Sequence, residues 1–205
     1  MNPINWAELL QWFNVPGYKH LYVLGSFARH VTLYAQQVRA LNLITALAQE
    51  NIIHEGREVV VVGGGAAGLT AAAGAAMHGA KVWVLEELEE LMELQRNNRQ
   101  RWLHPYIYDW PDMESQEQEA NLPLLRWSAG YSEQVAIQIE TAWNDLKPKY
   151  SFTVRLGVTN IGITPGRKGV TVTWHEATQN DTLTNPVVIL AVGFGLEPQN
   201  DYQDS

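Results

Sequence analysis

Residues 59–70 read VVVVGGGAAGLT, and this segment limits the possible folds more than any other part of the chain. Four valines in a row are typical of a strand that is buried on both faces, as strands of a parallel sheet are. Three consecutive glycines are unfavourable inside a strand or a helix, because glycine loses more backbone entropy on folding than any other residue. A buried strand that ends in a tight turn, where side chains would be obstacles, explains both features.

The residues around this turn predict a β-α-β unit. We expect a buried strand at 58–62, an alanine-rich helix at 68–78 that ends at Gly79, and a second strand at 81–85. Upstream, apolar residues recur every three or four positions from 30 to 49, which predicts a helix with one buried face. We interpret its polar residues Gln36, Gln37 and Arg39 as solvent-facing, and a polar cluster beside a cofactor site is the alternative.

The glycines of the turn have the spacing GxGxxG, at Gly63, Gly65 and Gly68. In a turn from strand to helix, the first glycine permits the bend, the second lets a diphosphate approach the backbone, and the third lets the helix pack on the sheet. The start of a helix also carries a partial positive charge. We therefore predict that main-chain N–H groups bind a diphosphate at Gly63, Gly64, Gly65, Ala66, Ala67 and Gly68.

An acidic residue stands where this motif requires one, about 20 residues further on. Glu86 follows the second strand directly, and its carboxylate is predicted to accept hydrogen bonds from a ribose. Glu87 comes next instead of an arginine, so a 2′-phosphate of NADP is not expected here. A purely structural turn is the alternative. The order of strand, turn, helix, second strand and acid within about 30 residues favours dinucleotide binding.

Composition excludes several classes of function. The 14 Lys and Arg residues are outnumbered by 22 Asp and Glu residues, which gives a net charge of −8 and argues against nucleic acid or an anionic membrane as a partner. Cysteine is absent, so any redox chemistry needs a bound cofactor. The six histidines show no metal-binding spacing, and no metal site is predicted. Without a membrane span or a targeting segment in its sequence, the protein is interpreted as soluble and cytoplasmic.

The segment VVVVGGGAAGLTAAAGAAMHGAKVWVLEE resembles the amino-terminal FAD-binding segment of the two-dinucleotide-binding-domain flavoproteins. A second segment, VVILAVGFGLEP (187–198), resembles the strand by which these proteins return to their FAD domain. The resemblance places Ala191, Val192 and Gly193 at the family's A-T-G triplet, with valine in place of threonine. Between the two, FTVRLGVTNIGITPGRKGVTVTWHE resembles a strand followed by a three-stranded meander, and it implies a backbone contact from Val158 to adenine.

The acidic stretch ELEELMEL (87–94), after the predicted ribose-binding acid, is helix-like. Residues 95–111, QRNNRQRWLHPYIYDWP, follow it. In similar flavoproteins this segment runs beside the pyrophosphate and the flavin, which implies that one of Arg96, Arg99 and Arg101 faces the phosphates. Surface ion pairs with nearby glutamates are the alternative for each arginine. For the remaining polar and aromatic residues, a packed loop is favoured over a flavin-facing wall: His104, Tyr106, Tyr108, Asp109 and Trp110. No catalytic residue is assigned.

The predicted fold class is α/β: a doubly wound, Rossmann-like parallel sheet with a small antiparallel β-meander and an amino-terminal helical extension. Residues 1–57 form the extension, and residues 58–205 form the FAD/NAD(P)-binding domain. The resemblance implies that this domain is incomplete at its carboxyl end, because similar flavoproteins contain a later segment that closes over the flavin. We therefore expect the rest of the protein, or a second chain, as a partner.

The function implied by the resemblance is FAD-dependent oxidoreduction of a small-molecule substrate. Two alternatives stay open. One is an NAD-binding dehydrogenase, because Glu86 suits the ribose of either cofactor. The other is a non-catalytic sensor or assembly module that binds FAD or NAD.

Overall fold

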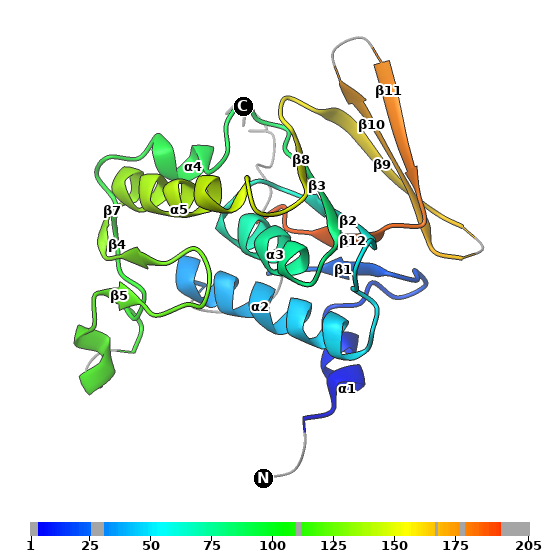
Figure 1. The fold of residues 1–205 in the computed structure, drawn as a ribbon. Coiled ribbons are helices and arrows are strands. Elements are labelled where there is room, and N and C mark those ends of the chain that lie inside the picture. The colour runs from blue at the N-terminus through cyan, green and yellow to red at the C-terminus, as the bar shows by residue number, and fades with distance from the viewer. Residues whose placement is uncertain (1–3, 26–30, 110–111, 167, 177–178, 194–205) are drawn as a thin grey trace, which may run out of the picture.

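The computed structural model describes residues 4–25, 31–109, 112–166, 168–176 and 179–193 (Figure 1). Its centre is a five-stranded sheet in the order β1-β12-β2-β3-β8, and each pairing within it is parallel. The strands are β1 (Leu21–Val23), β2 (Glu58–Val62), β3 (Lys81–Leu85), β8 (Phe152–Arg155) and β12 (Val187–Leu190). The two strands predicted around the glycine turn are confirmed.

Helices cover one face of this sheet (Figure 1). They are α2 (Leu33–Gln49), α3 (Ala66–Met77) and α5 (Ser132–Leu146). Successive residues of a strand point to opposite faces, so Val59 and Val61 are buried against these helices, whereas Val60 and Val62 are buried on the other side. This two-sided burial explains the unbroken run of valines.

An antiparallel meander covers the opposite face (Figure 1). Its strands are β9 (Thr159–Pro165), β10 (Val170–Glu176) and β11 (Gln179–Thr184), with β10 in the middle. Val170, Val172 and Trp174 of β10 are buried against the central sheet, where the rings of Trp174 and Trp83 lie 5.7 Å apart. The predicted parallel sheet, meander and amino-terminal helices are thus confirmed.

Smaller elements complete the chain. They are the helices α1 (Trp6–Gln11) and α4 (Glu93–Arg96), the 3₁₀ helix η1 (Met113–Gln116), and two short antiparallel pairs, β4 (Trp102–Leu103) with β7 (Gly130–Tyr131) and β5 (Glu119–Ala120) with β6 (Trp127–Ser128). In the part of the chain that the structure describes, no helix is long and apolar enough to cross a membrane.

The residues before the first predicted strand differ from the expectation in two ways. They contain a strand, β1, which the sequence did not suggest, and this strand pairs with β12 at one edge of the central sheet. The interpretation of Gln37 as solvent-facing was wrong, because its side chain is fully buried. A boundary between a 1–57 extension and the following domain stays a prediction.

Candidate functional site

Two of the three motif glycines are required by close packing of the backbone. Gly63 has a φ of +110°, and a Cβ atom there would overlap the carbonyl oxygen of Ala191, which follows β12. A Cβ atom on Gly68 would overlap the carbonyl oxygen of Gly63. These two glycines therefore let the bend lie against the end of β12 and let α3 lie against the bend.

Gly65 is different, because the space beside it is open. A Cβ atom on this residue would meet no heavy atom within 4 Å, and its φ of −79° suits any amino acid. Gly65 is the N-cap of α3, and no side chain caps this helix. The N–H groups of the first turn therefore lie beside an open space, which is the geometry that a bound diphosphate needs.

Glu86 lies at the same bend and turns its carboxylate toward the backbone. One carboxylate oxygen accepts a hydrogen bond from the N–H of Gly64 at 2.5 Å, and the other accepts one from the N–H of Leu88 at 2.9 Å. Each carboxylate oxygen can accept more than one hydrogen bond, so both retain capacity for a ribose hydroxyl. The neighbouring Glu87 is exposed.

The segment after Glu86 folds over one side of the bend, and the helix expected at 87–94 begins only at Glu93, in α4. Met92 has a left-handed backbone with a φ of +54°, and its N–H donates to the carbonyl oxygen of Gly64 at 3.1 Å. A Cβ atom on Gly64 would lie 2.6 Å from the side chain of Leu91. The bend is thus closed on the side of Gly64 and open on the side of Gly65.

The other predicted backbone contacts lie next to these residues. The N–H of Val158 donates to the carbonyl oxygen of Glu86 at 3.0 Å, which places its buried backbone beside the acid. The N–H of Ala191 donates to the carbonyl oxygen of Val62 at 2.8 Å, at the start of the bend. Val192 and Gly193 follow, with the side chain of Val192 exposed. The ends of β2, β3 and β12 therefore bring three separate sequence segments together.

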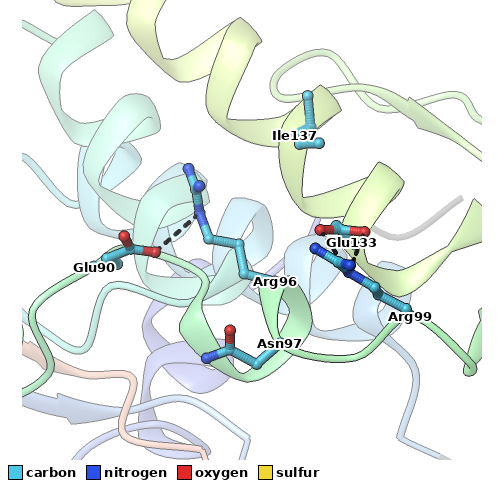
Figure 2. A pocket seen from close by; sticks show the side chains of 6 residues that line it. All are labelled: Glu90, Arg96, Asn97, Arg99, Glu133 and Ile137. Atoms are coloured by element: carbon cyan, nitrogen blue, oxygen red, sulfur yellow. Dashed lines mark hydrogen bonds and ion pairs between the residues drawn. The ribbon is translucent and has the colours of Figure 1, made fainter.

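The arginines at the end of the acidic stretch have carboxylate partners (Figure 2). The Nε atom of Arg96 donates to Glu140 of α5 at 2.8 Å and lies 3.6 Å from Glu90. Glu140 is only 9% exposed, and a buried carboxylate needs such a partner. Arg99 pairs with Glu133 at 3.1 Å. The pair of Arg96 with Glu90 and the pair of Arg99 with Glu133 line a pocket of about 310 Å³ between α4 and α5. A contact of one of these arginines with the phosphates stays a prediction.

Arg101 is exposed, and none of the ion pairs among the described residues includes it. The loop that follows packs locally: the N–H of Tyr106 donates to Nδ1 of His104 at 3.2 Å, and the ring of Tyr106 lies 5.0 Å from that of Tyr34 in α2. Trp110 lies outside the described residues. Within the described ranges, no three acidic or histidine side chains come together as a metal site.

A buried polar network supports the first turn of α3, and sequence reasoning missed it. The amide of Gln37 donates to the Thr70 hydroxyl at 3.1 Å and to the carbonyl oxygen of Leu125 at 3.2 Å, and it accepts from the indole N–H of Trp127 at 2.7 Å. The Thr70 hydroxyl donates in turn to the carbonyl oxygen of Ala66 at 2.7 Å. The available signal was helical spacing, because Gln37 lies three residues before the buried Ala40.

Comparisons with solved structures give low similarity over partial lengths. A bacillithiol disulfide reductase from Bacillus cereus is 18% identical, with 67% of this chain and 29% of that chain covered and a TM-score of 0.38. A pyridine nucleotide-disulfide family oxidoreductase from Enterococcus faecalis is 18% identical (88% and 32% covered, TM-score 0.42), and an NAD-dependent persulfide reductase from A. fulgidus is 15% identical (84% and 25% covered, TM-score 0.40). This chain therefore spans about a third or less of each of these proteins.

No curated protein sequence matches the chain significantly. The family model described as pyridine nucleotide-disulphide oxidoreductase matches residues 57–200, which include the glycine bend, Glu86, the meander and the return strand β12. Members of this family use FAD and NAD(P). Because the match covers well over half of the 205 residues, this chain belongs to the pyridine nucleotide-disulphide oxidoreductase family.

Proposed function

We propose that this chain binds FAD at the carboxyl ends of β2, β3 and β12 and forms part of an FAD-dependent oxidoreductase. The observation that carries the proposal is the open space beside Gly65, at the uncapped start of α3. Packing of the chain does not require a glycine here, since a Cβ atom would meet no heavy atom within 4 Å. A ligand that occupies this space explains why the position holds a glycine.

Each residue of the bend has a defined part in this proposal. The N–H groups from Gly65 to Gly68 bind the diphosphate, and Glu86 accepts hydrogen bonds from the adenosine ribose. Glu86 already accepts from Gly64 and Leu88, so its carboxylate is held in place before the ligand arrives. Residues 191–193 approach the same ligand from β12, and the backbone of Val158 contacts the adenine.

When bound, FAD supplies the hydride and electron transfer, and the protein supplies binding and orientation. The residues described above account for the adenosine and diphosphate half of the cofactor. We propose that the groups around the flavin ring belong to the rest of the polypeptide or to a second chain, with a small molecule as substrate. Arg96 and Arg101 stay predicted phosphate contacts, and Arg96 also pairs with Glu140.

Calorimetric titration of the 205-residue chain with FAD and with NAD tests the proposal. We expect saturable binding of FAD at one site and weaker binding of NAD, and mass spectrometry of material released by heating the purified protein should detect FAD. Tight binding of NAD without FAD binding would instead support the NAD-dependent alternative. Absence of binding for both dinucleotides would overturn the assignment.

A further inference from the structure

A second depression, of about 420 Å³, lies at the amino ends of the strands of the central sheet, opposite the glycine bend. It is lined by residues that precede three neighbouring strands, together with the loop after α2 and the turn before β10: Lys19, His20, Asn51, Ile52, His54, Arg57, Lys168 and Asn185. We call it the amino-edge pocket. Ligands of parallel sheets normally bind at the carboxyl ends of strands, so this location is separate from the FAD site proposed above.

The charge of the amino-edge pocket is opposite to that of the chain as a whole. The protein carries a net charge of −8, yet the lining contains Lys19, Arg57 and Lys168, two histidines and no acidic residue. None of the ion pairs among the described residues includes these three cations. The pKa of His20 is lowered, mainly by burial and then by the positive charges of Arg57 and Lys19.

The cations are not needed to complete the carboxyl end of α2, which lies at the same edge. Free carbonyl groups at a helix end can be satisfied by basic side chains. In this chain backbone N–H groups bind three of these carbonyl oxygens: Glu50 donates to Ala46 at 3.0 Å, Asn51 to Ala48 at 3.0 Å and Ile52 to Leu47 at 2.8 Å. The three cations of the pocket therefore have neither an ion pair nor a hydrogen bond to this helix end among the described residues.

Backbone hydrogen bonds hold two of the loops that line the pocket against the central sheet. The carbonyl oxygen of His20 accepts from Val188 of β12 at 2.8 Å, and that of Arg57 accepts from Lys81 of β3 at 2.9 Å. The Nη2 atom of Arg57 lies 3.3 Å from Nδ1 of His20, and since a guanidinium only donates, His20 is the acceptor. Arg57 and His20 are thus held in place beside the open space, which lowers the entropic cost of binding.

We propose that the amino-edge pocket binds the phosphate group of a small molecule. A guanidinium and two ammonium groups suit the multiple oxygens and the double negative charge of a phosphate monoester. The volume lies within the range of small-molecule sites, about 300 to 1,000 Å³, so it has room for an organic part beside the phosphate.

Titration with inorganic phosphate, followed by the amide NMR signals of the chain at constant ionic strength, tests this proposal. We expect saturable shifts for residues 19, 20, 51, 57 and 168, and tighter binding of glycerol 3-phosphate than of inorganic phosphate if an organic part is also recognised. Equal affinities would assign the site to free phosphate. A response to phosphate that does not saturate, or that sodium chloride reproduces, would overturn the proposal.

Variants separate this site from general electrostatics. Arg57→Gln and Lys168→Gln should each weaken phosphate binding about tenfold, which is the loss expected for one charge-assisted hydrogen bond. Lys147→Gln removes one charge from the exposed end of α5, outside the pocket, and should leave the affinity within about twofold. Equal losses in the Lys147 and Lys168 variants would contradict a defined site.

Discussion

The two ends of the parallel strands in the central sheet present different chemical groups. We call them the carboxyl edge, where the strands end, and the amino edge, where they begin. At the carboxyl edge, one continuous segment supplies main-chain N–H groups at the start of α3, and a single acid, Glu86, lies beside them. At the amino edge, side chains from separate loops supply the charge, among them Lys19, Arg57 and Lys168. A backbone site requires specific residues at fixed spacing and can be recognised as a motif. A side-chain site assembled from loops has no such spacing and emerges only from the fold.

The largest expected effect tests whether close backbone packing shapes the carboxyl edge. In Gly68→Ala the new methyl group overlaps the carbonyl oxygen of Gly63, so the free energy of unfolding should fall by about 3 kcal/mol, more than the roughly 1 kcal/mol that alanine gains in helix propensity. Gly74→Ala, in the same helix, would meet Ile44 at 3.2 Å and should change stability by less than about 1 kcal/mol. Urea unfolding measures both, and similar losses would contradict this role of Gly68.

The next effect concerns the buried support beneath that edge. Gln37→Leu leaves the indole N–H of Trp127 and the carbonyl oxygen of Leu125 unpaired, so stability should fall by about 2 to 3 kcal/mol. The adjacent Gln36 is a matched control, because its buried amide nitrogen has no hydrogen-bond partner among the described residues. Thermal unfolding should show little loss for Gln36→Leu. A neutral Gln37→Leu variant would show that the network does not hold α3.

A comparable effect on binding is expected for Glu86, the acid beside the glycine bend. Glu86→Ala should weaken FAD binding by about 1.5 to 3 kcal/mol, the range for hydrogen bonds to a charged group. Glu87→Ala distinguishes the two neighbouring carboxylates, and we expect a smaller loss because Glu87 is exposed. Calorimetry measures both affinities. An unchanged dissociation constant for Glu86→Ala would show that its carboxylate does not contact the ribose.

The smallest expected effect is on the pH dependence of stability, through His20 at the amino edge. Burial, Arg57 and Lys19 lower the pKa of His20 in the folded state, so the unfolded chain takes up the proton first as the pH falls below about 6.5. Stability should therefore decrease on acidification through this range. His20→Asn, which tolerates the left-handed backbone at φ +64°, should reduce the pH dependence by less than about 1 kcal/mol, because the imidazole is partly solvated. Identical pH profiles of unfolding would contradict this contribution.

Much of the carboxyl edge was predictable because its signals are local. The run of valines, the glycine spacing and the terminal acid determine β2, the bend and β3, and these elements lie where the sequence placed them. Resemblance extended the prediction to the meander and to β12. The sequence also predicted that Gly63 permits the bend and that Gly68 lets the helix pack closely, and a Cβ atom at either position would overlap backbone. Gly65 lies beside an open space, and its contact with a diphosphate stays a prediction.

Other features were not predictable, because tertiary contacts determine them. The strand β1 has only three residues and is defined by its pairing with β12, far away in the sequence. The acidic residues 87–92 looked helical, but the hydrogen bond from Met92 to Gly64 stabilises a different path over the bend. Arg96 was ambiguous from its position alone, since its main partner, the buried Glu140, lies on α5. Each of these outcomes depends on residues that the local sequence does not contain.

Calorimetric titration of Gly65→Val with FAD tests the central claim most directly. The added Cβ atom meets no heavy atom within 4 Å and the backbone φ suits valine, so the variant should unfold with nearly the free energy of the wild type. Because the same side chain occupies the space assigned to the diphosphate, we predict that FAD binding becomes undetectable. A well-folded Gly65→Val variant that binds FAD with wild-type affinity would contradict the placement of the cofactor at this bend.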